Sequence, residues 1–359
     1  MSTSHRRPLP ALAVGLLIAG AMAVTVELAA WGYETLRIPD LASPPEANAG
    51  PITMTTHPYL LWEHSPGMRQ ELGVSVNINS LGLRGPEPRL PKPEGIRRIL
   101  AVGDSSVYGF RVPFEDCFVQ VAAQRLGGPE QGLEGLPAAL PGYSTLQLLN
   151  LLQLRALRLE PDMIVIAALW SDHSTAGQQD AQLLDRYQRY DRSALGALDR
   201  AFHHSAFYRV LSWELGVRRG EQARTRASQN LDPTTTDGTS QRVPIADYRR
   251  NLEALVGMAR DHNAEVAFLV LPHPLDRTHH GRGQQSFEAY RTALREAAAA
   301  HGAPLVRGDQ VFEQAVAQDP SLGGGDLFVD RIHPSVLGHR LLGEALGEAL
   351  SDWEQTTRP

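Results

Sequence analysis

A serine at position 105 is the first residue of this sequence with a pattern suited to chemistry. It follows Gly103 and Asp104, which come directly after the short apolar run 98–102, a run typical of a buried parallel strand. Ligands of parallel α/β sheets bind at the carboxyl ends of the strands, and a serine that begins a helix there exposes its hydroxyl and aims its own N–H at an oxyanion. The position suits a nucleophile, although Asp104 and Ser105 would equally serve to cap a helix.

A carboxylate and an imidazole, Asp330 and His333, lie three residues apart near the C-terminus, just before the last predicted helix. At this spacing they can share one turn, where the carboxylate fixes the tautomer of the imidazole and stabilises the imidazolium. The other ring nitrogen can then take the proton from a serine hydroxyl. Alone, the pair would fit a capping aspartate and a surface histidine; with Ser105 it predicts nucleophilic catalysis.

Together the two motifs resemble those of the SGNH hydrolase superfamily, also called GDSL lipases and esterases. The resemblance covers residues 96–350, with G-D-S at 103–105 and D-x-x-H at 330–333. It implies a flavodoxin-like three-layer α/β/α fold with a parallel central sheet. It also implies that Ser105 is the nucleophile, His333 the general base and then acid, and Asp330 the orienting carboxylate, with no cofactor and no metal.

The two middle blocks of the family supply the rest of the oxyanion hole. Gly142 resembles the glycine of the second block, whose N–H faces the oxyanion. The third block is normally G-x-N-D, but this sequence has L-W-S-D at 169–172, so that Ser171 replaces the asparagine amide. A serine hydroxyl can donate a hydrogen bond but is shorter, and loss of one oxyanion donor costs ~10²–10³ in turnover. A slow esterase, a rearranged hole and a relative without catalytic activity all fit this departure.

Other reactive residue types have simpler interpretations. His273, His279 and His280 cluster in one loop, but no matched ligand set accompanies them, and we expect no metal. Ser106 is out of register with the family's nucleophile. The single cysteine, Cys117, is expected to be a packed small side chain rather than a reactive thiol.

The elements that must position these residues alternate between strands and helices. Strands are expected at 98–102, 163–169 and 266–271, and helices at 145–159, 245–262 and 336–353. Such alternation predicts a doubly wound α/β sheet. We therefore place an SGNH hydrolase domain at 96–355, with an insertion or cap at 178–243 that contains two predicted helices.

The segment 34–95 is interrupted by many prolines and is predicted to be a spacer with a small appendage. Two stretches within it, 57–62 and 79–85, are too apolar or too turn-specific for a linker. We expect them to fold against the main domain, where the appendage and the insertion would frame the acyl and leaving-group sites.

The N-terminal region, residues 1–33, is predicted to be a membrane anchor. Residues 8–26 form an uncharged apolar run directly after Arg6 and Arg7, close to the ~20 residues that cross a bilayer. The arginines should remain in the cytoplasm, which places the rest of the chain outside it, periplasmic or on the cell surface. Small residues at 21 and 23 leave open a cleaved signal sequence, in which case the protein would be secreted.

Composition restricts the partners. The formal charge of −6 argues against a nucleic-acid partner, and a single cysteine excludes an internal disulfide framework. We expect a serine esterase that hydrolyses a carboxylic ester of an envelope glycan, a lipid or a secreted small molecule through an acyl-enzyme on Ser105. The alternatives are an O-acyltransferase acting on an extracytoplasmic polysaccharide and a catalytically impaired binding protein.

Overall fold

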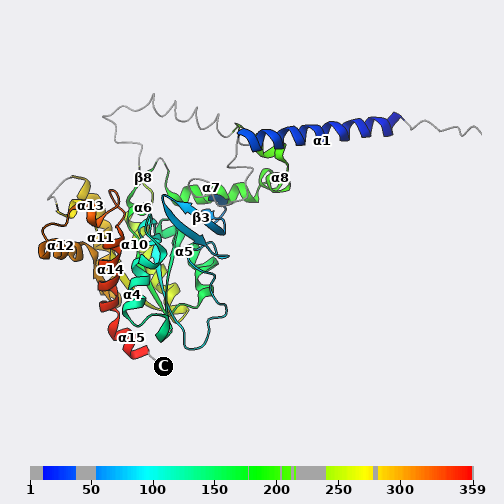
Figure 1. The fold of residues 1–359 in the computed structure, drawn as a ribbon. Coiled ribbons are helices and arrows are strands. Elements are labelled where there is room, and N and C mark those ends of the chain that lie inside the picture. The colour runs from blue at the N-terminus through cyan, green and yellow to red at the C-terminus, as the bar shows by residue number, and fades with distance from the viewer. Residues whose placement is uncertain are drawn as a thin grey trace, which may run out of the picture. The chain divides into compact units, whose positions relative to one another are not determined.

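The computed structural model describes residues 11–37, 54–176, 178–202, 204–211, 214–215, 240–277 and 282–357. The chain divides into two compact units. The N-terminal unit consists of Met1–Pro44 and Arg189–Thr236, and the sheet unit consists of Pro45–Gln188 and Asp237–Pro359. Each unit is described separately, and Figure 1 gives the labels of their elements.

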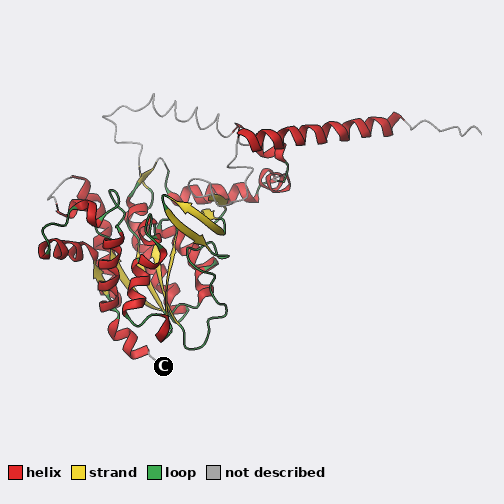
Figure 2. Cartoon of the chain, in the orientation of Figure 1, coloured by secondary structure: helices red, strands yellow, loops and turns green. Residues whose placement is uncertain are grey.

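A parallel five-stranded sheet forms the centre of the sheet unit (Figure 2). Its strands are β5 (Arg97–Gly103), β6 (Leu133–Ala139), β7 (Met163–Ala167), β10 (Glu265–Val270) and β11 (Leu305–Arg307). Their order across the sheet is β11-β10-β7-β5-β6. Counted along the chain this order is 2-1-3-4-5, the flavodoxin-like arrangement, whose switch point lies between β5 and β7.

Helices cover both faces of this sheet, which gives the expected three-layer α/β/α architecture (Figure 1). One layer contains α4 (Phe118–Arg125), α12 (Gly308–Gln318) and α14 (Val336–Ala349). The other contains α5 (Thr145–Leu154), α10 (Ile245–Asp261) and α11 (Arg282–His301). β5 and β7 are buried along their whole length, as the central strands of a sheet covered on both sides must be.

The three predicted strands correspond to β5, β7 and β10, and the other two strands of this sheet, β6 and β11, were not predicted. β6 contains Gly135 and Pro137, which are unfavourable in most strands. It lies at the edge of the sheet, where a proline is tolerated, and a Cβ on Gly135 would come within 2.3 Å of the Val119 carbonyl oxygen. β11 has only three residues, too few for a pattern.

Two predicted helices are shorter than expected. The helix expected at 145–159 ends at Leu154 and is followed by a 3-10 turn, Ala156–Leu159. The helix expected at 336–353 is interrupted at Leu350, which separates α14 from α15 (Ser351–Thr357). The short second elements also bury apolar side chains, Ala156 and Leu159 in the first and Trp353 in the second, so the apolar pattern of the sequence does not mark either break.

The described part of the appendage contains two β-hairpins, followed by a segment of turns over residues 79–95. β1 (Met54–His57) pairs with β2 (Leu61–His64), and β3 (Gly67–Glu71) pairs with β4 (Val74–Ile78). Leu60 and Leu83 are buried in the same hydrophobic core as the central sheet. The two stretches singled out in the sequence therefore pack against the sheet unit, as expected.

Arg84 connects this appendage to the segment that follows β5. Its guanidinium is fully buried and donates hydrogen bonds to the carbonyl oxygens of Tyr108, Gly109 and Val112 at 2.8, 2.6 and 2.5 Å. These carbonyls lie at and just beyond the end of α3 (Ser105–Tyr108), the short helix that begins with Ser105. The appendage thus stabilises the turn that carries the predicted nucleophile.

The N-terminal unit contains α1 (Ala11–Arg37), α8 (Ala194–Phe202) and the helical residues 206–211. Within α1, Ala13–Leu36 is long and apolar enough to cross a membrane, with a mean hydropathy of 2.0. Arg6 and Arg7 lie outside the described residues. α7 (Asp180–Arg192) and α8 account for the two helices predicted in the insertion.

Candidate active site

Ser105 lies at the carboxyl end of β5, at the switch point of the sheet. A Cβ on Gly103 would come within 2.5 Å of the Ala167 carbonyl oxygen of β7, so only glycine allows the two strands to approach this closely. The Asp104 side chain caps α3 by accepting the N–H of Ser106 at 3.0 Å. Ser105 remains partly exposed, whereas Ser106 is buried. The turn therefore offers one serine hydroxyl to a ligand.

His333 contacts both other residues of the predicted triad. Its Nε2 lies 2.7 Å from Ser105 Oγ, and its Nδ1 lies 2.7 Å from Asp330 Oδ2. A carboxylate cannot donate, so the Nδ1–H donates to Asp330 and the lone pair of Nε2 accepts from the hydroxyl. The structure thus brings together three residues predicted from two distant motifs, in the arrangement of a nucleophile, a base and an orienting group.

The loop that carries His333 is closed by backbone pairing. Phe328 and Pro334 form an isolated β-bridge, and the N–H of Val329 donates to the carbonyl of His333 at 2.9 Å. The following residue, Ser335, caps α14. A closed loop anchored on a long helix holds the imidazole in a fixed direction.

Asp330 is held from within the same loop. Its Oδ1 accepts the N–H groups of Ile332 and His333, each at 3.0 Å, which leaves Oδ2 for the imidazole. Partial burial would raise the pKa of Asp330, but these N–H donors and the histidine together lower it below its usual value. The ring of Phe110 lies 4.5 Å from the imidazole, centroid to centroid, and supports it from one side.

Gly142 lies in the turn that follows β6 and has a φ of +81°, a conformation that favours glycine. A Cβ at this position would also come within 3.1 Å of the Trp62 ring. Within the described part of the chain, neither the N–H of Gly142 nor that of Ser105 donates a hydrogen bond. Both backbone donors are therefore free to bind an oxyanion.

The peptide that carries the Gly142 N–H is held by the appendage. Trp62 Nε1 donates to the carbonyl oxygen of Pro141 at 3.1 Å. This carbonyl and the Gly142 N–H belong to one peptide group, which is planar and trans, so the two point in opposite directions. The indole of Trp62 consequently sets the direction of the Gly142 N–H.

Arg242 holds the next peptide of the same turn. It donates to the Gly142 carbonyl at 2.8 Å and forms a two-pronged ion pair with Asp180, at 2.9 and 2.8 Å. Its guanidinium also lies 5.7 Å from the ring centroid of Trp62. The turn is thus fixed from both sides by residues that lie far away in the sequence.

The third block, residues 169–172, follows β7. Asp104 of the first block, residues 103–105, connects the two by hydrogen bonds. Asp104 Oδ2 accepts the N–H groups of Trp170 and Ser171 at 3.1 and 3.3 Å. Burial raises the pKa of Asp104, and the N–H donors act in the opposite direction. Because the Ser171 N–H is used in this way, only its hydroxyl is available for a ligand. That hydroxyl has no hydrogen-bond partner among the residues that the structure describes.

Asp172 connects the third block to the second. It is fully buried and accepts the N–H of Thr145 at 3.0 and 3.1 Å and the Thr145 hydroxyl at 2.5 Å. Thr145 begins α5, directly after the turn that contains Gly142. Burial raises the pKa of Asp172 to about 7 despite these donors.

The other candidates of the sequence have structural roles or lie outside the described residues. His273 packs in an aromatic cluster with Trp170 and Phe287, at centroid distances of 5.1 Å. His279 and His280 lie outside the described residues. Across the described ranges, no group of three histidine, cysteine or acidic side chains could hold a metal ion. Cys117 is fully buried, which raises its pKa to about 11, in agreement with a packed side chain.

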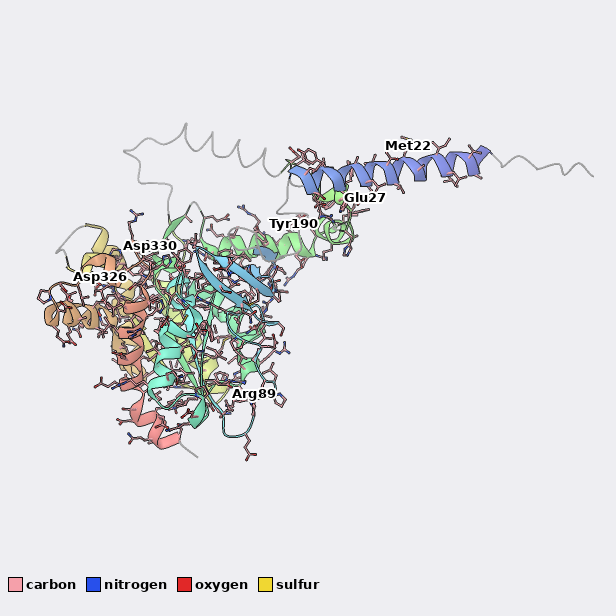
Figure 3. All side chains as sticks on the ribbon, in the orientation of Figure 1. Met22, Glu27, Arg89, Tyr190, Asp326 and Asp330 are labelled. Carbon is pink, nitrogen blue, oxygen red and sulfur yellow. The ribbon has the colours of Figure 1, made fainter. Side chains whose placement is uncertain are left out.

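A pocket of about 660 Å³ lies beside the triad loop. Its lining is mostly apolar and includes Phe328, Val329, Asp330 and Ile332 from this loop, together with His273 and Pro274. Asp330 and Asp326 are labelled in Figure 3. Ser105 and His333 are not among the lining residues, so the pocket adjoins the triad without containing the nucleophile.

Three residues of this site were not predicted from the sequence. Trp62 lies in a stretch that was singled out only as apolar, and Phe110 and Arg242 belong to no motif. Trp62 and Arg242 reach the Gly142 turn across 79 and 100 residues of sequence. Contacts between residues so far apart in the sequence cannot be predicted from a local sequence pattern.

Comparison with known proteins agrees with the fold and the motifs. The model of the GDSL-like lipase/acylhydrolase family matches residues 101–341, about two thirds of the chain. The chain belongs to this family, and it is an ester-hydrolysing enzyme. No curated protein matches the sequence.

Several crystal structures resemble the chain. An acetylxylan esterase from Geobacillus stearothermophilus is 14% identical, with a TM-score of 0.46, over 71% of this chain and 94% of that one. A lipase/acylhydrolase from Enterococcus faecalis is 17% identical, with a TM-score of 0.43, over 72% and 97%. An α/β hydrolase enzyme from the metagenome of Lake Arreo, Spain, is 17% identical, with a TM-score of 0.46, over 70% and 94%.

Proposed function

We propose that this protein is a membrane-anchored serine esterase that hydrolyses a carboxylic ester through an acyl-enzyme on Ser105. One observation carries the proposal: His333 lies 2.7 Å from Ser105 Oγ through one ring nitrogen and 2.7 Å from Asp330 through the other. This is the geometry that activates a serine hydroxyl for attack on a carbonyl.

In the first half of the reaction, Ser105 Oγ attacks the ester carbonyl while its proton moves to His333 Nε2. Asp330, whose lowered pKa keeps it ionised, stabilises the imidazolium. When the tetrahedral intermediate collapses, the bond to the alkoxide breaks and His333 donates its proton to the leaving oxygen. A water molecule then attacks the acyl-enzyme, giving its proton to His333, and the released Ser105 oxygen takes that proton back as the carboxylic acid departs.

Acylation and deacylation each pass through a tetrahedral intermediate with a negatively charged oxygen. We propose that this oxyanion accepts hydrogen bonds from the N–H groups of Ser105 and Gly142 and from the hydroxyl of Ser171. The two N–H groups have no partner within the described part of the protein, and the Trp62 and Arg242 contacts hold the Gly142 turn in place. Donors that are already fixed cost no reorganisation when charge develops. The Ser171 hydroxyl takes the position of the family's asparagine amide.

We further propose that α1 remains in the membrane and that the sheet unit lies outside the cytoplasm. The supporting observations are the helix Ala13–Leu36, which is apolar enough to cross a membrane and has no charged residue before Glu27, and the two arginines that precede it in the sequence. This location restricts the substrate to an acyl ester of an envelope glycan, a lipid or a secreted small molecule.

Ester hydrolysis by the full-length protein in detergent tests the mechanism. The substrates are p-nitrophenyl acetate and butyrate, and the comparison is with Ser105→Ala and His333→Ala. We expect hydrolysis by the parent and its loss in both variants. Hydrolysis retained by Ser105→Ala would place the nucleophile elsewhere, and an inactive parent would favour acyl transfer to an absent acceptor or a binding role.

A further inference from the structure

Two glutamates interrupt the apolar surface of α1. Glu27, Ala30 and Glu34 follow one another at intervals of three and four residues and so share one side of the helix. Ala30 and Glu34 are buried and Glu27 is partly buried, whereas the large apolar side chains of α1 are exposed. A carboxylate in a membrane helix is costly unless it has a partner.

The partners of both carboxylates come from the insertion, within the same unit. Glu27 accepts hydrogen bonds from three donors at the start of the helical segment 206–211: the Ser205 hydroxyl and the N–H groups of Ala206 and Phe207. Glu34 receives two hydrogen bonds of 2.7 Å from the guanidinium of Arg209. The predicted insertion or cap at 178–243 is divided between the two units. Its described residues from Arg189 to Leu215 belong to the unit that contains α1, whereas those at its two ends, 178–188 and 240–243, belong to the sheet unit.

A stripe of large apolar side chains on α8 remains uncovered. Leu195, Leu198 and Phe202 are 66%, 51% and 52% exposed, and their spacing places them on one side of the helix. With Met22 and Val26 of α1 they line a groove of about 880 Å³. Figure 3 labels Met22, Glu27 and Tyr190 at this groove. A contiguous apolar surface of this kind marks an interaction site.

The length of the apolar run in α1 indicates that the apolar stripe of α8 lies against a lipid bilayer. Residues 11–26 of α1 carry no charge, and at a rise of about 1.5 Å per residue they extend over roughly 24 Å, most of the hydrocarbon core of a bilayer, which is ~30 Å thick. If α1 crosses the bilayer there, Glu27 lies at its outer edge. The groove residues Met22 and Val26 then lie in the last turns of the embedded part, so the stripe of α8 lies at the depth of the headgroups.

The helices beside the groove carry no excess charge. α8 contains Asp199 and Arg200, and Arg209 of the helical residues 206–211 is paired with Glu34. Helices with one apolar side and one polar side bind in the plane of the bilayer surface. The stripe lines one groove with Met22 and Val26 of α1, so a membrane that surrounds α1 also reaches the stripe.

We propose that α8 and the helical residues 206–211 lie in the outer headgroup region of a phospholipid bilayer beside α1, with Leu195, Leu198 and Phe202 facing the acyl chains. This inference rests on the proposed membrane anchoring of α1. The protein then contacts the bilayer at two places, through a spanning helix and through an interfacial segment that binds both of its carboxylates.

Lipid-borne quenchers test this in the full-length protein reconstituted in vesicles of phosphatidylcholine and phosphatidylglycerol. An environment-sensitive fluorophore is attached to Leu198→Cys, to Arg200→Cys on the opposite side of α8, and to Leu17→Cys in the middle of the apolar run. Cys117 is fully buried, so we expect it to remain unlabelled in the folded protein. Doxyl groups are placed either near the headgroup or deep in the acyl chain.

We expect headgroup-level doxyl lipids to quench the label at Leu198 but not the label at Arg200, and deep doxyl lipids to quench the label at Leu17 most. Quenching at Leu17 without quenching at Leu198 would overturn this inference while the anchor stands. An intermolecular disulfide between unlabelled Leu198→Cys chains, without lipid quenching, would overturn it in favour of a dimer interface. Absence of quenching at all three positions would overturn the anchor itself.

Discussion

The indole of Trp62 donates a hydrogen bond to the carbonyl oxygen of Pro141, 3.1 Å away. The same peptide group carries the N–H of Gly142, so a residue of the N-terminal appendage orients a donor of the proposed oxyanion hole. Trp62 touches no reacting atom in this account and acts only by positioning. In the proposed mechanism the appendage therefore contributes to the active site, by positioning the Gly142 turn.

Trp62→Phe should lower kcat and leave KM nearly unchanged. Phenylalanine keeps the packing of the ring but cannot donate, and one lost hydrogen bond of about 1 kcal/mol corresponds to roughly fivefold in rate. Steady-state hydrolysis of p-nitrophenyl acetate measures the change. Trp353→Phe is the matched control, because the Trp353 indole N–H has no hydrogen-bond partner in the described part of the protein. Equal activities of the two variants would exclude the positioning role of Trp62.

Ser171→Ala should lower kcat by about 10², because the proposed third oxyanion donor is lost. Ser171→Asn should raise kcat above that of the parent, since the longer amide restores the family's donor. The same ester assay measures both, with circular dichroism to verify folding. If the alanine variant keeps full activity, another group fills this position in the hole.

Asp330→Asn should reduce kcat on the order of 10⁴-fold. The N–H groups of Ile332 and His333 both point at Oδ1, so the amide oxygen occupies that position and the NH₂ faces the imidazole. Nδ1 must then accept, which places the proton on Nε2 and removes the base from Ser105. Asp326→Asn, in the short helix Gly324–Leu327 that precedes this loop and outside the triad, provides the control in the ester assay. A loss of less than tenfold would contradict the assigned tautomer.

Asp172→Asn should change how stability depends on pH. Burial raises the pKa of Asp172 from an ordinary value of about 4 to about 7. Between pH 4 and pH 7 the folded state binds more protons than the unfolded state. The contribution of Asp172 to the stability of the folded state is therefore fully present below pH 4 and is lost as pH rises through 7. The Tm of the parent relative to the variant should therefore fall between pH 5 and pH 8. A Tm difference that is independent of pH would show that Asp172 does not titrate in this window.

The sequence predicts the parts of the fold that depend on local pattern. β5 and β7 are continuous apolar runs because both faces of the sheet are covered. β6 has no such run, since Gly135 is required by the approach of α4 and Pro137 is tolerated only at the sheet edge. β6 forms because of tertiary packing, so it could not be predicted from the local sequence.

The same distinction holds for the site. Ser105, Asp330 and His333 belong to motifs of three or four residues, and the structure places them within hydrogen-bond distance as predicted. Trp62 and Arg242 act on the Gly142 turn only through the tertiary fold. Their chemistry is ordinary for tryptophan and arginine, so residue type alone could not identify them.

Covalent labelling of the full-length protein with a fluorophosphonate, followed by mass spectrometry of its peptides, tests directly whether His333 activates Ser105 as the nucleophile. We expect one adduct, on Ser105, that is absent in Ser105→Ala and His333→Ala. It should persist in Ser106→Ala, the same substitution one residue further on. Labelling of another serine, or labelling of Ser105 that does not require His333, would contradict the proposed mechanism.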